Sequence, residues 1–213
     1  MTAEPYAAEA EPPVSANDVA EAPPGLSPFV GRRLDLGVGA AIADDDRKML
    51  TPYTEIAPGV FVGFEANSGA RVCVSRSEEA GALRLEVEQV ARTRWLTIET
   101  EIGGQELLET GVALWSLTAS CTPRAKCRLG LRLWRCEAGQ FEDIHVGDMA
   151  IRPESMQIAE VVRVSADKLS GMPAQPNPRF LLFLPLHEAA YVMRSLTVTP
   201  ASDCGWRRSA APN

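Results

Sequence analysis

Three residues in two segments of the chain have side chains suited to binding a ligand. Trp95 precedes an alternating stretch in which Leu96 and Ile98 have the opposite parity. Arg132 and Trp134 alternate with leucines in a second stretch. If both stretches are strands, Trp95, Arg132 and Trp134 project from the polar sides of those strands, away from the core. An indole can stack on the C–H groups of a sugar ring, and a guanidinium can bond hydroxyls or a carboxylate. We therefore expect Trp95, Arg132 and Trp134 to form a ligand-binding surface.

Trp115 could extend this surface, because it lies on another predicted strand with a mixed pattern. The alternative is that the tryptophans belong to the core, covered by the segment 29–50 or by the proline-rich loop 170–178. Exposed aromatic side chains on a strand face often mark a binding surface. The sequence leaves both interpretations open.

Nothing in the sequence has the pattern of a catalytic centre. The chain has two histidines, His145 and His187, and it lacks the GxSxG motif of a serine nucleophile. Carboxylates on predicted strands could in principle cleave glycosides, a reaction whose acid pair is defined only in three dimensions. Alternation predicts that these acids face solvent: Glu86, Glu88, Glu99 and Asp143. We expect no catalytic residues.

Two acidic clusters could be considered for a metal, and neither has a full ligand set. Asp143 and His145 alternate, so they share one face of an extended segment, but no third ligand follows nearby. We interpret this segment as the polar edge of a strand that leads into a turn at Gly147. The run 44–46, three aspartates, lacks the alternate spacing of a calcium loop. We expect no metal and no cofactor.

The pattern of the segment Arg179–Thr199 indicates two strands around which the rest of the fold is organised. The part 179–186 is apolar on both parities, which is typical of a strand buried on both faces. The part 191–199 alternates and is rich in β-branched residues, and we expect it to pair with the first part across a tight connection. Further strands are predicted at 60–64, 71–75, 82–90, 94–102, 112–120, 126–136 and 157–166. Segments 112–120 and 126–136 are expected to form a hairpin.

Short strands at regular intervals, without a convincing amphipathic helix, predict an all-β protein: an antiparallel two-sheet β-sandwich. We expect a disordered acidic arm at 1–28, rich in Pro, Ala and Glu, and a connecting segment at 29–50 that packs on the domain. The sandwich is expected to span 51–200. A flexible tail would follow at 201–213.

The order of these strands resembles the jelly-roll, galactose-binding-like sandwiches that include many carbohydrate-binding modules. The resemblance covers roughly 55–200 and rests on the strand Trp95-Leu96-Thr97-Ile98, a central pair and a closing pair. It implies a non-catalytic module that recognises glycans, with an accessory role in polysaccharide synthesis or modification. The last strand, around Met193, lacks the Asp that such modules often carry, which argues against their calcium site. The alternative is a structural or protein-interaction module.

Composition limits the choice of partners and compartment. The net charge is −7, and five acidic residues without Lys or Arg lie in 1–28, so clustered positive charge for nucleic acid is not expected. No apolar run is long enough to span a membrane. The five cysteines lack CxxC spacing and are expected to be free thiols, although a Cys121–Cys127 bridge is geometrically feasible. The N-terminal residues lack the pattern of a signal peptide, which favours the cytoplasm.

Overall fold

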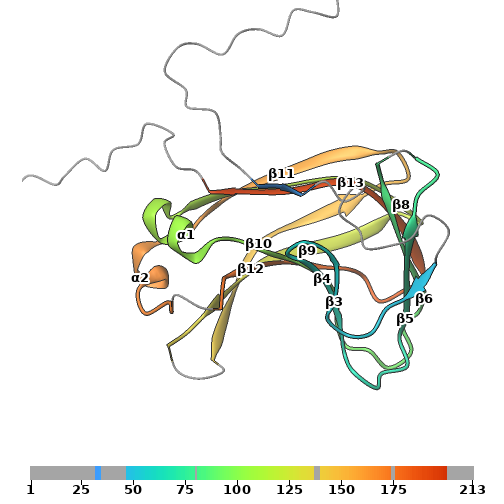
Figure 1. Ribbon diagram of the computed structural model, residues 1–213, viewed down its shortest axis with the longest axis horizontal. Helices are drawn as coiled ribbons and strands as arrows, with labels where there is room; N and C mark the ends of the chain where they lie inside the picture. Colours follow the sequence, from blue (N-terminus) through green and yellow to red (C-terminus); the bar gives the residue numbers. More distant parts are fainter. Residues whose placement is uncertain (1–31, 35–46, 80, 137–139, 174–175, 201–213) are drawn as a thin grey trace, which may run out of the picture.

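The computed structural model describes residues 32–34, 47–79, 81–136, 140–173 and 176–200. Within these ranges the chain forms two antiparallel sheets packed face to face (Figure 1). Sheet A has the order β11-β8-β13-β6-β5-β2, with β1 also paired to β13. Sheet B has the order β10-β9-β12-β7-β4-β3. The expected all-β, two-sheet antiparallel sandwich is confirmed.

The strands of sheet A are β1 (Arg32–Leu34), β2 (Lys48–Met49), β5 (Arg71–Arg76), β6 (Leu83–Gln89), β8 (Val112–Thr122), β11 (Met156–Arg163) and β13 (Ala189–Pro200). Those of sheet B are β3 (Thr54–Ala57), β4 (Val60–Phe64), β7 (Leu96–Glu101), β9 (Ala125–Trp134), β10 (Phe141–Ile151) and β12 (Arg179–Phe183). Two short helices complete the described structure: α1 (Gly104–Thr110) and α2 (Ala166–Leu169).

The core lies between the two sheets and is built by the alternation of apolar residues. In β9 the leucines at 129, 131 and 133 are fully buried, while Arg132 and Trp134 on the opposite parity are partly exposed. Trp115 shares its parity on β8 with Ala113 and Leu117, and all three are buried between the sheets. Trp115 is therefore a core residue, and its suggested place in the binding surface was wrong.

Both expected hairpins are wrong, because the chain crosses between the sheets at these points. Strand β8 pairs with β11 and β13 in sheet A, whereas β9, the next strand, pairs with β10 and β12 in sheet B. Likewise β12 lies between β9 and β7 in sheet B, and β13 lies between β8 and β6 in sheet A. The two strands of each expected hairpin therefore lie in different sheets, on opposite sides of the core. Strands β12 and β13 each have a neighbour on both sides, so both are central strands.

The sequence analysis expected no helix, and α1 departs from that expectation. Leu107 of α1 is completely buried against the core, which fixes the helix to the end of the sandwich. Gly111 ends the helix with a φ of 64°, and its N–H donates to the carbonyl of Leu107. Glycine tolerates this left-handed conformation without steric cost. Neither helix in the described ranges has the length and hydropathy to cross a membrane.

Several expectations concern residues outside the described ranges. These are the acidic arm at 1–28, the glycine-rich part of the connecting segment with the aspartates at 44–46, Cys204 and the C-terminal tail at 201–213.

The four described cysteines are free, and they differ strongly in burial. Cys121 and Cys127 are buried, and desolvation raises the pKa of Cys121 to about 11 and that of Cys127 to about 12. Cys136 is exposed. The feasible Cys121–Cys127 bridge is thus absent from this structure.

This contrast predicts selective thiol labelling. In a Cys204→Ser variant at about pH 8, Cys136 should react with a disulfide reagent at least about tenfold faster than the buried cysteines, because the thiolate is the reactive form. Peptide mass spectrometry over time would measure each rate. Rapid labelling of Cys127 in the native protein would contradict the burial described here.

Candidate functional site

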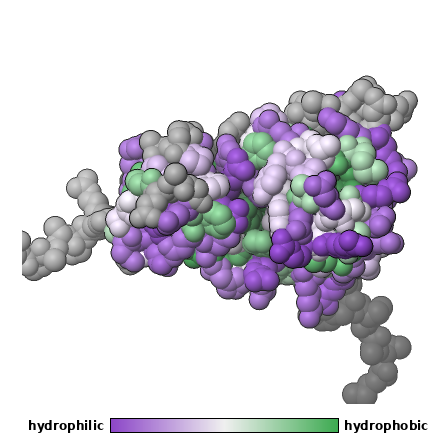
Figure 2. All heavy atoms as spheres, turned by 90° about the horizontal axis from the view of Figure 1, so that it is seen from below, coloured by the Kyte–Doolittle hydropathy of each residue, from purple (hydrophilic) through white to green (hydrophobic). Residues whose placement is uncertain are grey.

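The candidate site lies on the side of sheet B that faces away from the core. We call this side the outer face. In Figure 1, β10, β9 and β12 of sheet B lie below β11 and β13 of sheet A, and Figure 2 views the molecule from below. Hydrophobic residues, in green, are exposed there among hydrophilic residues, in purple (Figure 2). The aromatic residues of the outer face are Tyr53, Phe61, Trp95, Trp134 and Phe141, and its ionic residues include Glu99, Glu101, Arg132, Asp143 and Arg179.

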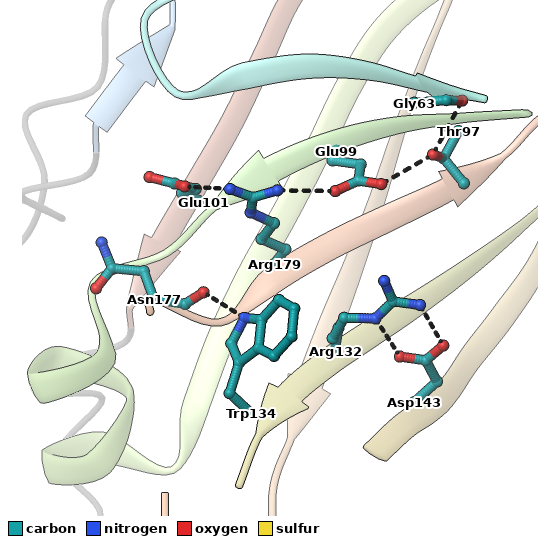
Figure 3. Close-up of polar contacts among 9 residues, drawn as sticks. All are labelled: Gly63, Thr97, Glu99, Glu101, Arg132, Trp134, Asp143, Asn177 and Arg179. Carbon is teal, nitrogen blue, oxygen red and sulfur yellow. Dashed lines mark hydrogen bonds and ion pairs between the residues drawn. The ribbon is translucent and has the colours of Figure 1, made fainter. Parts of the chain in front are cut away.

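Trp134 and Phe141 form an aromatic pair at one end of this face. They are opposite each other in the β9–β10 ladder, and their rings meet edge to face with centroids 5.7 Å apart. The indole Nε1–H of Trp134 donates to the carbonyl oxygen of Asn177 at 3.1 Å, which fixes the plane of the ring (Figure 3). Trp134 is partly covered and Phe141 is 48% exposed. A planar, apolar surface with a fixed orientation is therefore presented to solvent.

A row of ionic groups crosses four strands next to this pair. The ladder register places Asp143, Arg132, Arg179 and Glu101 side by side on β10, β9, β12 and β7. Arg132 binds Asp143 through two parallel hydrogen bonds of 2.8 Å, and its guanidinium lies 3.9 Å from the centre of the Phe141 ring (Figure 3). These hydrogen bonds raise the pKa of Arg132, which therefore stays charged. We call these four residues the ionic row.

Arg179 connects the ionic row to a buried carboxylate at the centre of the outer face. Its two terminal nitrogens bind Glu101 at 2.8 Å and Glu99 at 3.2 Å, and its guanidinium lies 4.7 Å from the centre of the Phe61 ring. Its Nε–H is buried and has no hydrogen-bond acceptor among the described residues. A buried donor without a partner is energetically unfavourable, so it favours a ligand or water oxygen at this point.

Glu99 was expected to face solvent, and that expectation was wrong. Its side chain is only 3% exposed, even though it lies on the outer side of β7. The hydroxyl of Thr97 lies 3.1 Å from one carboxylate oxygen, and Arg179 binds the other (Figure 3). Gly63 on the neighbouring strand makes room for this group, because a Cβ there would lie 2.9 Å from the Glu99 carboxylate. Burial with these partners holds the Glu99 carboxylate in one position.

Tyr53 and Trp95 form a second aromatic pair, with ring centroids 5.6 Å apart. Tyr53 is 49% exposed and has a φ of 60°, a left-handed conformation that is costly for a residue with a Cβ. Burial raises the pKa of the Tyr53 phenol, the charge of Glu99 adds to that rise, and Arg132 and Arg179 oppose it. The phenol therefore lies within electrostatic range of the ionic groups. Backbone strain of this kind is concentrated at functional sites.

The structure separates the three residues that sequence analysis grouped. Arg132 and Trp134 are neighbours on β9, and both contact Phe141. Trp95 lies two strands away and near the opposite ends of the strands, because its neighbour Thr97 is in register with Phe183. Eight residues along the strand direction, at about 3.3 Å each, separate the backbone positions of the two tryptophans by roughly 25 Å. The Trp95 ring reaches back toward the centre of the face, since a Cβ on Gly63 would lie 3.1 Å from it. The ionic groups lie between the two backbone positions, and the Trp95 ring packs at Gly63 beside the Glu99 carboxylate.

Asp143 and His145 share the outer face as expected, but the carboxylate of Asp143 is occupied by Arg132. The neighbouring Glu142 is bound by Lys168 and Arg135, which lower the pKa of Glu142. No group of three or more potential metal ligands occurs in the part of the chain that the structure describes. The segment is extended as expected and lies on the edge strand β10, but the expected turn at Gly147 is wrong. The strand continues through Gly147 to Ile151, with a register shift between His145 and Gly147.

Sequence analysis missed Tyr53, Phe61, Phe141 and Arg179 as members of this surface. Phe61 and Arg179 lie on predicted strands and have the parity of the outer face, so alternation carried a signal for them. Tyr53 precedes its strand in a turn, where periodicity carries no information. Phe141 could be assigned only once β10 was known to pair with β9.

No protein-family model matches the sequence, and no curated protein matches it. Among solved structures, the chain is similar to the CBM22-1 xylan-binding domain from Paenibacillus barcinonensis Xyn10C, at 10% identity and a TM-score of 0.44 over 78% of this chain and 91% of that chain. It is similar to a CBM4 structure, at 13% identity and a TM-score of 0.49 over 74% of this chain and 96% of the other. The xylan-binding module CBM15 matches at 8% identity and a TM-score of 0.45, over 73% and 97%.

The resemblance to carbohydrate-binding β-sandwiches that the sequence suggested is therefore also found among solved structures. At these identities and TM-scores the likeness carries no conclusion on what this chain binds. The ligand has to be inferred from the residues of the outer face.

Proposed function

We propose that the outer face of sheet B binds a neutral glycan and that the chain is a non-catalytic glycan-recognition module. The observation that supports this most directly is the combination of two aromatic pairs with ion-paired polar groups on one face of one sheet. Sugar rings have apolar C–H surfaces and many hydroxyls. Aromatic rings match the first, and fixed carboxylate and guanidinium groups match the second.

The charges of the outer face favour a neutral ligand over an acidic one. Its ionic row and Glu99 comprise two arginines and three carboxylates. Both arginines already bind carboxylates, so the fork of Arg132 is not open to an incoming acid. The carboxylates retain lone pairs that can accept hydrogen bonds from hydroxyl groups. This modifies the expectation that Arg132 would bind either hydroxyls or a carboxylate.

In its biological setting we propose an accessory role in polysaccharide synthesis or modification, in which this domain holds a glycan for another component. The placement of the two aromatic pairs on different strands, β9–β10 and the β3–β7 side, with the ionic groups between them, supports a ligand longer than one sugar ring. Both the glycan-recognition function and the accessory role depend on glycan binding at Trp95, Arg132 and Trp134.

A titration of the full chain with a panel of soluble neutral polysaccharides and oligosaccharides tests the proposal. Binding is followed by tryptophan fluorescence and by isothermal calorimetry. Saturable binding of at least one neutral glycan is the expected result. A structural or protein-interaction module would instead show no response to any glycan, together with a concentration-dependent dimer in light scattering.

Salt dependence provides a further prediction. Since the cations of the ionic row are neutralised within the protein, raising NaCl from about 50 mM to about 500 mM should change the affinity for the neutral glycan by less than about twofold. Calorimetry at both concentrations measures this. A tenfold loss at high salt would indicate that ligand charge drives binding.

A further inference from the structure

A separate pocket lies on the same side of sheet B, between β9, β10 and the end of β12. Its volume is about 620 Å³, and its polar lining consists of Lys126, Arg128 and Asp148. Phe183 and Pro185 contribute an apolar wall. Pockets for small ligands have volumes of roughly 300–1,000 Å³, so this one has the size of a binding site.

The charges of this pocket differ from those of the ionic row. The pocket contains two cations and one carboxylate, and no carboxylate in the described ranges forms an ion pair with Lys126 or Arg128. Asp148 is opposite Arg128 in the ladder without such a pair. The pocket is therefore locally positive on a chain whose net charge is −7. An anionic group is the complement of two free cations.

The apolar wall limits the shape of the ligand. The guanidinium of Arg128 lies 5.7 Å from the centre of the Phe183 ring, which orients the cation beside an aromatic surface. A ligand that contacts both needs an acidic group attached to a ring or chain with apolar C–H groups. A bare anion would leave the wall of Phe183 and Pro185 unused.

The pocket is next to the path proposed for the glycan. Phe183 is in register with Thr97 on β7, so the pocket lies at the end of the outer face where Trp95 lies. A glycan that runs from Trp134 to Trp95 passes from β9 across β12 to β7. The pocket lies to one side of this path, toward β9 and β10. A group that branches from a glycan on the outer face could therefore reach it.

We propose that the pocket of Lys126 and Arg128 binds the carboxylate of a uronic acid, either as a free sugar or as an acidic branch of a glycan whose main chain is neutral where it crosses the outer face. The choice of a sugar as the carrier of the carboxylate rests on the proposed function of the outer face. The charge of the pocket itself does not depend on that function.

The test is a titration of the full, isotopically labelled chain with glucuronate, followed by NMR, with glucose and acetate as matched probes. Glucuronate should perturb the signals of Lys126, Arg128 and Asp148 more strongly than either probe does. Lys126→Gln and Arg128→Gln should each weaken glucuronate binding about fivefold to tenfold, as expected for one charged hydrogen bond. Asp148→Asn should strengthen it about threefold, because a like charge is removed.

Arg163→Gln is the control, since Arg163 is an exposed arginine on β11 of sheet A and its loss should leave binding unchanged. The gain expected from Asp148→Asn is a result that misfolding cannot produce. Equal perturbation by glucose and glucuronate, equal binding of acetate, or an equal loss in the Arg163 variant would overturn the proposal.

The two proposals fail separately. Neutral glycan that binds in a Trp134-dependent way, with no response of the pocket to glucuronate, would overturn the pocket and leave the outer face standing. Glucuronate at the pocket, with no neutral glycan bound anywhere, would support an acidic-sugar pocket and overturn the function proposed for the outer face.

Discussion

Replacing Trp134 by alanine should lower the affinity for the neutral glycan by about thirtyfold or more, equivalent to about 2 kcal/mol, the loss typical of a central tryptophan in an interface. The variant loses the indole surface and its edge-to-face contact with Phe141. Its hydrogen bond to Asn177 is lost as well, so the ligand meets a less ordered end of the face. Isothermal calorimetry with a long oligosaccharide measures the change.

Trp134→Phe separates the two contributions. Phenylalanine keeps an aromatic surface but cannot donate to the carbonyl of Asn177, so we expect an intermediate loss. Val161→Ala is the matched control, because Val161 is a highly exposed apolar residue on β11 of sheet A. An affinity unchanged in Trp134→Ala, or reduced equally in Val161→Ala, would contradict a binding site on the outer face.

Trp95→Ala adds a test of ligand length. Because Trp95 and Trp134 start from backbone positions eight residues apart along the strands, we expect a long oligosaccharide to contact both. A long ligand should therefore lose affinity in either variant, and a disaccharide should respond to only one of them. Equal responses of the disaccharide to both variants would show that the two tryptophans do not act as separate contacts.

Replacing Arg179 by alanine should destabilise the fold by about 3 kcal/mol, because it leaves a buried carboxylate without its counter-ion. The Glu99 side chain is 3% exposed and Arg179 is 21% exposed, so this pair is much less hydrated than a surface ion pair. The loss of the contact between Arg179 and the Phe61 ring adds to the effect. Urea unfolding followed by tryptophan fluorescence measures the free energy of unfolding.

A surface ion pair serves as the comparison. Arg194 binds Glu79, and both side chains are close to half exposed, so Arg194→Ala should cost less than about 1 kcal/mol. The double variant Arg179→Met, Glu99→Leu should recover most of the stability, since apolar residues can replace a buried ion pair. If Arg179→Ala were no more destabilising than Arg194→Ala, Glu99 would have to be hydrated in solution.

The period-two pattern was enough to predict nine of the strands and the polar side of most of them, but it missed β10 and the short strands β1, β2 and β3. Leucines at alternate positions of β9 identify its buried side, and this places Arg132 and Trp134 on the other side. The same rule applied to β8 would have placed Trp115 with Ala113 and Leu117 in the core. The sequence therefore determined the class of fold and which side chains face away from the core.

Only the tertiary structure decided which strands are neighbours. Strands that follow each other in the chain can pair in one sheet or cross to the other, and alternation looks the same in both cases. The connections after β8 and after β12 cross between the sheets, and this brings Arg179 between Arg132 and Glu101. It also buries Glu99, because the covering comes from Arg179 and from the groups around Gly63 on a different strand.

The separation of Trp95 from Trp134 is likewise a property of the register. The amino-acid sequence determines which residues of each strand face the core and which face solvent, since that division depends on local spacing alone. The distance between two outward residues depends on long-range pairing, which no local pattern encodes.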